Sequence, residues 1–212
     1  RIGTAADELA RKFGGAKDPV AQSRILTDLR KFLDDPKTSP QFKTTFGVEY
    51  ARAFEPFFTT AALSQSLGTV IILEKVSSPQ VRDKFVAILT SSPLPAVRYW
   101  AVKGLRSALA SAKDAKDSED IIDVLGQQGA AESEPLVLTN IYDLLLWAAN
   151  QSKTGESERI ALALATVLDA RVAAPGDRIG QGANDSAGYA AAATAYPAVK
   201  GDVAAQRKLV LS

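Results

Sequence analysis

Proline-opened apolar segments recur along this chain at intervals of about 40 residues, and this spacing limits the possible folds more than any other feature. Four openings fall at Pro19, Pro56, Pro95 and Pro135, about 37 to 40 residues apart. A second, offset series recurs every 38 to 40 residues or so. Its members are Ser39, Ser78 or Pro79, Asp117 and Glu156. Two series with one period indicate repeated pairs of elements, each of which buries its apolar face only by stacking on the next pair.

The apolar spacing between these openings is typical of helices. Apolar residues recur at steps of three and four, and no segment alternates convincingly as a strand does. Proline suits the first turn of a helix because it has no amide hydrogen to leave unpaired there. The expected helices are 4–13, 19–33, 40–54, 57–76, 79–89, 95–112, 118–128, 135–151, 156–172, 186–196 and 202–211. Their short connections predict antiparallel neighbours, so the predicted fold class is all-α.

One opening carries a fuller motif. Residues 95 to 105 match the pattern Pro-x-Val-Arg-x-x-Ala-x-x-small-Leu, and a related Pro-Gln-Val-Arg begins at Pro79. The motif resembles the second helix of HEAT and armadillo repeats, although it is complete in this one repeat and degenerate elsewhere. The resemblance implies a right-handed α-solenoid of about five antiparallel helix pairs. The resemblance implies a fold but no particular activity, since the family contains scaffolds, transport adaptors, nucleic-acid binders and occasional enzymes.

The C-terminal part departs from the repeat. We expect the HEAT-like repeats to occupy residues 1–172. Residues 173–202 are rich in Gly and Ala, and segments such as Pro175-Gly176-Asp177 indicate a loop. Residues 173–212 are therefore expected to form a loop and variant capping helices within the same domain.

Two residue types that serve much of enzyme chemistry are missing. The 212 residues include no His and no Cys. This excludes the commonest catalytic base, thiol nucleophiles, disulfides and thiolate zinc sites. No catalytic spacing or calcium-loop motif is present either, so we predict a protein that is not an enzyme and holds no cofactor or metal.

The charge balance and hydropathy bear on partners and location. The chain has 25 Lys and Arg against 24 Asp and Glu, so its net charge does not favour nucleic acid or an anionic membrane. No run of 18 apolar residues is present, and we expect no membrane span. The chain begins at Arg1 without a Met, which we interpret as processing or trimming. Both the cytoplasm and export after signal-peptide removal stay open as locations.

Candidate binding residues lie on the second helix of each pair, which lines the concave surface in the family that the chain resembles. In the helix expected from Pro95, a rotation of about 100° per residue places Tyr99, Lys103 and Arg106 opposite the apolar side. Trp100 is expected in the core with Val97, Ala101 and Leu105. The equivalent outward positions are Ser23, Thr27 and Arg30; Thr60, Ser64 and Leu67; and Thr139, Asp143 and Leu146. Because few of these are basic, the surface disfavours nucleic acid, whose phosphates require repeated Lys or Arg.

A second candidate cluster lies on the helix 135–151, where Asn140, Asp143 and Trp147 share the polar side. A tryptophan beside a carboxylate suits stacking on a flat ligand or anchoring of a peptide. The alternative is that Trp147 packs against an adjacent repeat. HEAT-like DNA glycosylases use a carboxylate and aromatic residues on a basic concave surface. No such basic surface is predicted here, so neither Asp143 nor Trp147 is assigned a catalytic role.

Together these features predict a non-catalytic helical-repeat scaffold that binds a protein or peptide partner through its second-helix face. The expected partner-binding residues are Tyr99, Lys103, Arg106, Asn140, Asp143 and Trp147. Two alternatives stay open: a nucleic-acid-binding or DNA-repair HEAT-like protein, and a helical domain cut from a larger protein whose activity lies elsewhere.

Overall fold

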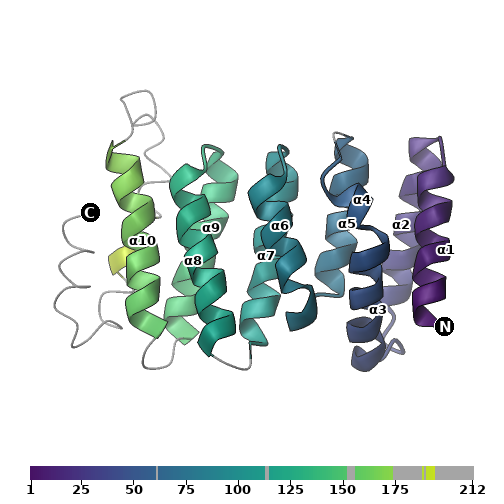
Figure 1. Ribbon diagram of the computed structural model, residues 1–212, viewed down its shortest axis with the longest axis horizontal. Helices are drawn as coiled ribbons and strands as arrows, with labels where there is room; N and C mark the ends of the chain where they lie inside the picture. Colours follow the sequence, from purple (N-terminus) through teal and green to yellow (C-terminus); the bar gives the residue numbers. More distant parts are fainter. Residues whose placement is uncertain (61, 113–114, 152–155, 174–187, 189, 194–212) are drawn as a thin grey trace. The chain divides into compact units, whose positions relative to one another are not determined.

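The computed structural model describes residues 1–60, 62–112, 115–151, 156–173, 188 and 190–193. Every regular element in these residues is helical (Figure 1), which confirms the all-α prediction. The chain divides into two compact units, Arg1–Ser111 and Ala112–Ser212. Among the helices described, none combines the length and the hydropathy that a membrane span requires.

Unit 1 consists of two layers of helices in its described residues. Its elements are α1 (Ile2–Gly15), α2 (Pro19–Asp34), α3 (Pro40–Ala53), α4 (Glu55–Phe58), α5 (Leu63–Lys75), the 3-10 turn η1 (Pro79–Val81), α6 (Arg82–Ser91) and α7 (Pro95–Ala110). Within this unit, Figure 1 shows α1, α3 and α6 in one layer and α2, α5 and α7 behind them. Helix α1 packs on α3, α2 packs on α5, and α7 packs on both α5 and α6.

Local caps explain where the first helices begin and end. Asp18 Oδ1 accepts a hydrogen bond of 2.9 Å from the amide of Val20, and Pro19 occupies the first turn of α2. The buried Gln22 side chain donates to the carbonyl oxygens of Phe13 and Ala16, at 3.3 and 2.8 Å. Gln22 thereby satisfies carbonyl groups at the end of α1 that have no partner inside that helix.

The single helix predicted for residues 57–76 is wrong. Pro56 opens only the one-turn helix α4, and α5 begins at Leu63. Ser66 Oγ donates to the carbonyl oxygen of Thr60 at 2.9 Å, and the hydroxyls of these residues lie 3.0 Å apart. Such side-chain bonds compete with the helical hydrogen-bond pattern and hold the break between α4 and α5. Thr60 therefore lies outside any helix. The long helix expected to open near Pro56 begins at Leu63 instead, so the regular spacing of helix starts is broken here.

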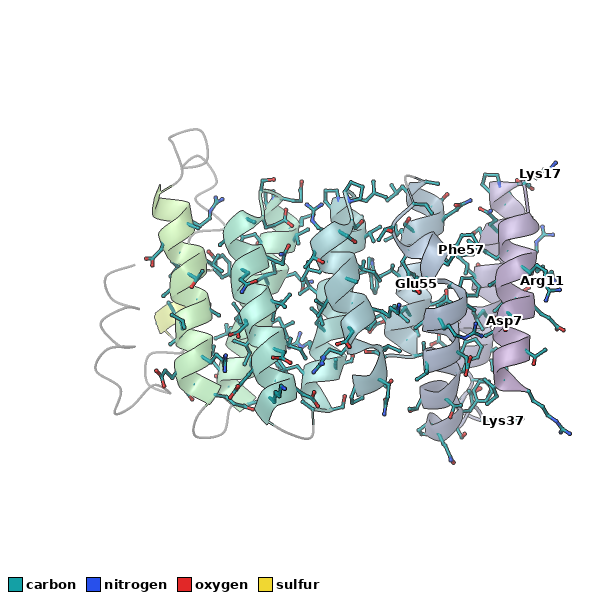
Figure 2. All side chains as sticks on the ribbon, in the orientation of Figure 1. Asp7, Arg11, Lys17, Lys37, Glu55 and Phe57 are labelled. Carbon is teal, nitrogen blue, oxygen red and sulfur yellow. The ribbon has the colours of Figure 1, made fainter. Side chains whose placement is uncertain are left out.

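Ion pairs connect neighbouring helices at the surface of unit 1. Arg52 on α3 donates to Asp7 on α1 at 2.8 Å and to Glu49 at 3.1 Å, and Asp7 is labelled in Figure 2. The hydrogen bond that Arg52 donates to Asp7, followed by the one it donates to Glu49, raises the pKa of Arg52. Lys84 on α6 forms a similar pair with Glu55 on α4 at 2.6 Å. Because these groups are well exposed to solvent, they help to set the alignment of helices more than they add stability.

Aromatic rings fill the core where α1, α3 and α4 meet. Tyr50 and Phe54 stack with ring centroids 4.2 Å apart, and Phe13 meets the edge of Phe57 at 5.0 Å. Tyr50 is fully buried, and its hydroxyl donates to the carbonyl oxygen of Thr69 on α5 at 3.1 Å. A buried hydroxyl needs such a partner, so this bond joins the two layers.

Unfolding of unit 1 is expected to become easier above about pH 10 because of Tyr50. Burial raises the pKa of Tyr50 well above the ordinary 10.0. The unfolded chain therefore releases this proton at lower pH than the folded chain, and stability is lost as the pH rises from about 10 toward the folded pKa. Tyr50→Phe is expected to cost about 1 kcal/mol at neutral pH through the lost hydrogen bond. Its stability should then decline less steeply above about pH 10 than that of the wild type.

Urea unfolding followed by circular dichroism between about pH 7 and pH 11 measures both effects. Tyr99→Phe is the matched control, because Tyr99 is only half-buried. It should retain the alkaline decline of the wild type. Equal alkaline slopes for Tyr50→Phe and the wild type would contradict the assignment to Tyr50.

Unit 2 contains α8 (Ala115–Ala131), α9 (Pro135–Gln151) and α10 (Glu156–Ala173) in its described residues. Helix α8 packs on α10, and both pack on α9. The approach is close, since a Cβ atom on Gly126 of α8 would lie 3.0 Å from Cα of Ala163 on α10. The helix expected at 186–196 is helical at residues 188 and 190–193. The remainder of that helix, the 202–211 helix and most of the expected loop lie outside the described residues.

Candidate functional site

Helix α7 gathers two aromatic rings around one lysine. Nζ of Lys103 lies 4.7 Å from the ring centroid of Trp100 and 5.2 Å from that of Tyr99. The two rings are 6.2 Å apart and meet edge to face at 84°. All three side chains are half-buried, and we call them the α7 cluster. A cation over two aromatic faces is attracted to their electron density, by about 0.5 to 1 kcal/mol for an exposed pair.

The structure corrects the prediction that Trp100 belongs to the core. Trp100 is half-buried, whereas Val97, Ala101 and Leu105 are fully buried on the inner side of α7. The helical rotation places Trp100 at the edge of this apolar side, three residues before Lys103. The ring at that edge lies against the ammonium group of Lys103 instead of entering the core. Helical rotation alone does not separate this edge from the centre of the core, so the sequence did not reveal the position of Trp100.

The predicted residues Tyr99, Lys103 and Arg106 share one side of α7. Tyr99 and Lys103 are in direct contact, and Arg106 is exposed further along the helix. The residues expected at equivalent positions in the other helices of unit 1 differ in their exposure to solvent, and one of them is not helical. Ser23, Thr27 and Arg30 are exposed on α2, Ser64 is exposed and Leu67 half-buried on α5, and Thr60 is not helical.

The second predicted cluster lies on α9 in unit 2. Asp143 is exposed, and Asn140 and Trp147 are half-buried. The same side carries Leu136, which is 71% exposed and was not predicted as a site residue. Its signal was its position four residues before Asn140, on the polar side of the helix. Helix α9 thus presents an apolar residue near its start, a carboxylate in the middle and an indole near its end.

The titratable groups with raised pKa values have structural roles. The hydrogen bond with Asp123 raises the pKa of Arg159, whose guanidinium holds both oxygens of that carboxylate at 2.8 and 2.9 Å. In the part of the chain that the structure describes, no group of three or more His, Cys, Asp or Glu residues is arranged to hold a metal ion. The described clusters on α7 and α9 offer cationic, anionic and aromatic contacts, which suit recognition of another molecule.

A scan against protein-family models gave no match, and searches of curated proteins and of solved structures found none either. The likeness to HEAT and armadillo repeats therefore rests on the motif at Pro95 and on the period of the helices.

Proposed function

We propose that this chain is a non-catalytic α-solenoid of the HEAT or armadillo type that binds a protein or peptide partner. The two-layer arrangement within unit 1 supports the architecture, because α2, α5 and α7 are successive neighbours in one layer. Helix pairs that stack in this manner leave one helix face of each pair available for binding. The right-handed twist and the number of pairs are part of the proposal.

The observation that carries the function is the α7 cluster. Trp and Tyr, together with Arg, are the residues most enriched where binding energy concentrates in protein interfaces. Lys103 lies against two rings, so its side chain has less conformational entropy to lose when a partner binds. Its ammonium group and the exposed Arg106 attract a carboxylate, while Tyr99 and Trp100 offer apolar area. The ligand that fits is an acidic peptide segment with an adjacent aromatic or aliphatic side chain.

Nucleic acid fits this surface less well. A surface that follows a phosphate backbone repeats its cations at each step, because every contact releases a condensed counterion. On α2 the exposed cations Arg24, Arg30 and Lys31 lie near Ser23 and Thr27, whereas the expected outward residues of α5, Ser64 and Leu67, are uncharged, so the cations do not repeat from one helix to the next. The repair-enzyme alternative requires that missing basic series as well, so protein binding is the proposed function.

Peptides selected from a random display library on the 212-residue chain are expected to depend on the α7 cluster. Enriched peptides should carry Asp or Glu beside an apolar residue. In fluorescence anisotropy, Lys103→Ala and Tyr99→Ala should each weaken binding by about 5- to 10-fold, as expected for loss of roughly 1 to 1.4 kcal/mol.

Lys84→Ala is the matched control, because Lys84 lies on α6 in the other layer and pairs with Glu55. It should leave peptide affinity unchanged. Equal binding by wild type, Lys103→Ala and Tyr99→Ala would count against the α7 cluster. Binding of duplex DNA with a steep dependence on salt would replace the proposal with the nucleic-acid alternative.

A further inference from the structure

A groove with an apolar floor and a basic edge lies between α1 and α2 in unit 1. It encloses about 380 Å³. Three half-buried aliphatic side chains form its floor, while two cations and one carboxylate lie exposed at its edge. These residues are Leu9, Ile25, Leu29, Lys12, Arg24 and Asp28. We call this surface the α1–α2 groove.

The cations of the α1–α2 groove are available to a partner. Among the described residues, neither Lys12 nor Arg24 forms an ion pair. Lys31, also exposed, lines the adjoining surface of α2. The groove and this adjoining surface therefore carry three cations against the one carboxylate of Asp28, and they favour an acidic partner.

Helix α10 of unit 2 carries a surface of opposite character. Glu158, Leu162 and Asp169 follow one line along the helix, and all three are exposed. Leu162 keeps 46% of its surface exposed although it is a large apolar residue. Glu158 and Asp169 form no ion pair with a described residue. We call these three residues the α10 stripe.

Neighbouring charges make the surroundings of the α10 stripe more acidic still. Glu119 and Asp123 on α8 line the hollow beside Glu158, and among the described residues that line it the one cation is Arg159. Both carboxylates of α8 already hold that guanidinium. The two carboxylates exceed the one guanidinium in charge, so this cluster adds to the negative charge of the α10 stripe.

We propose that the α1–α2 groove of one copy of this chain binds the α10 stripe of a second copy. Leu162 then rests on the aliphatic floor while Glu158 and Asp169 meet Lys12, Arg24 or Lys31. The stripe is short enough to lie along the groove, since Glu158 and Asp169 are about 16 Å apart at 1.5 Å per residue and the 14 residues of α1 extend about 21 Å.

This contact is independent of the α7 cluster, because it uses other helices. It is also heterologous, since the groove and the stripe are different surfaces. A pair joined by one such contact keeps one groove and one stripe unoccupied and can continue as a ring or a chain of molecules, whereas a pair joined by two of them is closed as a dimer.

Sedimentation velocity of variants of the 212-residue chain tests the contact between groove and stripe. The groove variant is Lys12→Glu with Arg24→Glu, and the stripe variant is Glu158→Gln with Leu162→Ser, so that the two altered surfaces do not attract each other. All four positions are exposed, and circular dichroism checks that both variants stay helical. The wild type should sediment faster as its concentration rises, whereas each variant alone should stay monomeric. An equimolar mixture of the variants should form dimers and nothing larger, because the groove variant supplies an intact stripe and the stripe variant an intact groove.

Lys37→Glu is the control for a changed surface charge, since Lys37 is exposed outside both surfaces, and it should associate as the wild type does. A wild type that stays monomeric at every concentration would overturn the proposal and leave the groove to a different acidic partner. Self-association of the groove variant alone or of the stripe variant alone would overturn it as well. So would a mixture of the two variants in which no dimer forms. Added salt should weaken wild-type assembly by screening the exposed charges, and assembly that strengthens with salt would contradict the charge pairing.

Discussion

Phe54→Ala is expected to lower the free energy of unfolding of unit 1 by about 3 to 5 kcal/mol, the range for truncating a buried phenylalanine. Phe54 is fully buried at the end of α3. Its ring stacks on Tyr50 at 4.2 Å and contacts Phe13 and Phe57 at 5.6 and 5.8 Å. Truncation removes the common neighbour of three rings from three helices, so the surroundings cannot close the cavity by moving one side chain.

The natural tryptophans make this effect measurable in one unit. Trp100 lies in unit 1 and Trp147 in unit 2. In a Trp147→Phe background, urea unfolding followed by fluorescence therefore reports on unit 1 alone. Phe32→Ala is the control, because Phe32 is 51% exposed and has one ring contact, with Phe42 at 5.5 Å. It should cost no more than about 1 kcal/mol. A similar loss for both variants would show that the buried aromatic cluster is not the main source of stability.

The helix starts were predictable from sequence wherever a local signal acts alone. Pro19, Pro40, Pro95, Pro135 and Glu156 each begin a helix as expected. Proline and its neighbouring cap act within one turn, so no information about distant residues is needed. The right-handed solenoid and the family resemblance stay predictions.

The features that the sequence did not reveal depend on contacts between distant residues. The break before α5 is held by bonds of Ser66 with Thr60, and Thr69 of α5 accepts the hydroxyl of Tyr50 from α3. The spacing of apolar residues along the sequence does not predict such hydrogen bonds. The division after Ser111 was not visible either, because the helix openings keep a similar interval on both sides of it.

The candidate surfaces were likewise predictable from the sequence only where the contacting residues lie on one helix. The contact between Tyr99 and Lys103 follows from a four-residue spacing on one helix, and it was predictable. The part played by Trp100 was not, because helical rotation alone does not distinguish the edge of the core from its centre. The acidic surroundings of the α10 stripe were also hidden, since Glu119 and Glu158 come together only when α8 packs on α10.

Gly104→Ala is expected to destabilise unit 1 by about 2 to 3 kcal/mol, although alanine favours a helix by about 1 kcal/mol over glycine. A Cβ atom at Gly104 would lie 2.2 Å from Cε1 of Phe85 on α6. Phe85 is fully buried, so its ring has no solvent-side space to enter. The small residue in the Pro95 motif therefore permits the close approach of α6 and α7.

Rescue by a second substitution separates this clash from any other effect of alanine. Phe85→Leu removes ring atoms that meet the new Cβ, so Gly104→Ala should cost less in that background, by about 1 kcal/mol or more. Gly15→Ala is the matched control, since no atom lies within 4 Å of its added Cβ, and it should be neutral or slightly stabilising. Urea unfolding of the four members of the cycle measures the coupling. If the two substitutions were strictly additive, Phe85 would not be the obstacle, and the small residue would have to be explained by the path of the α7 backbone instead.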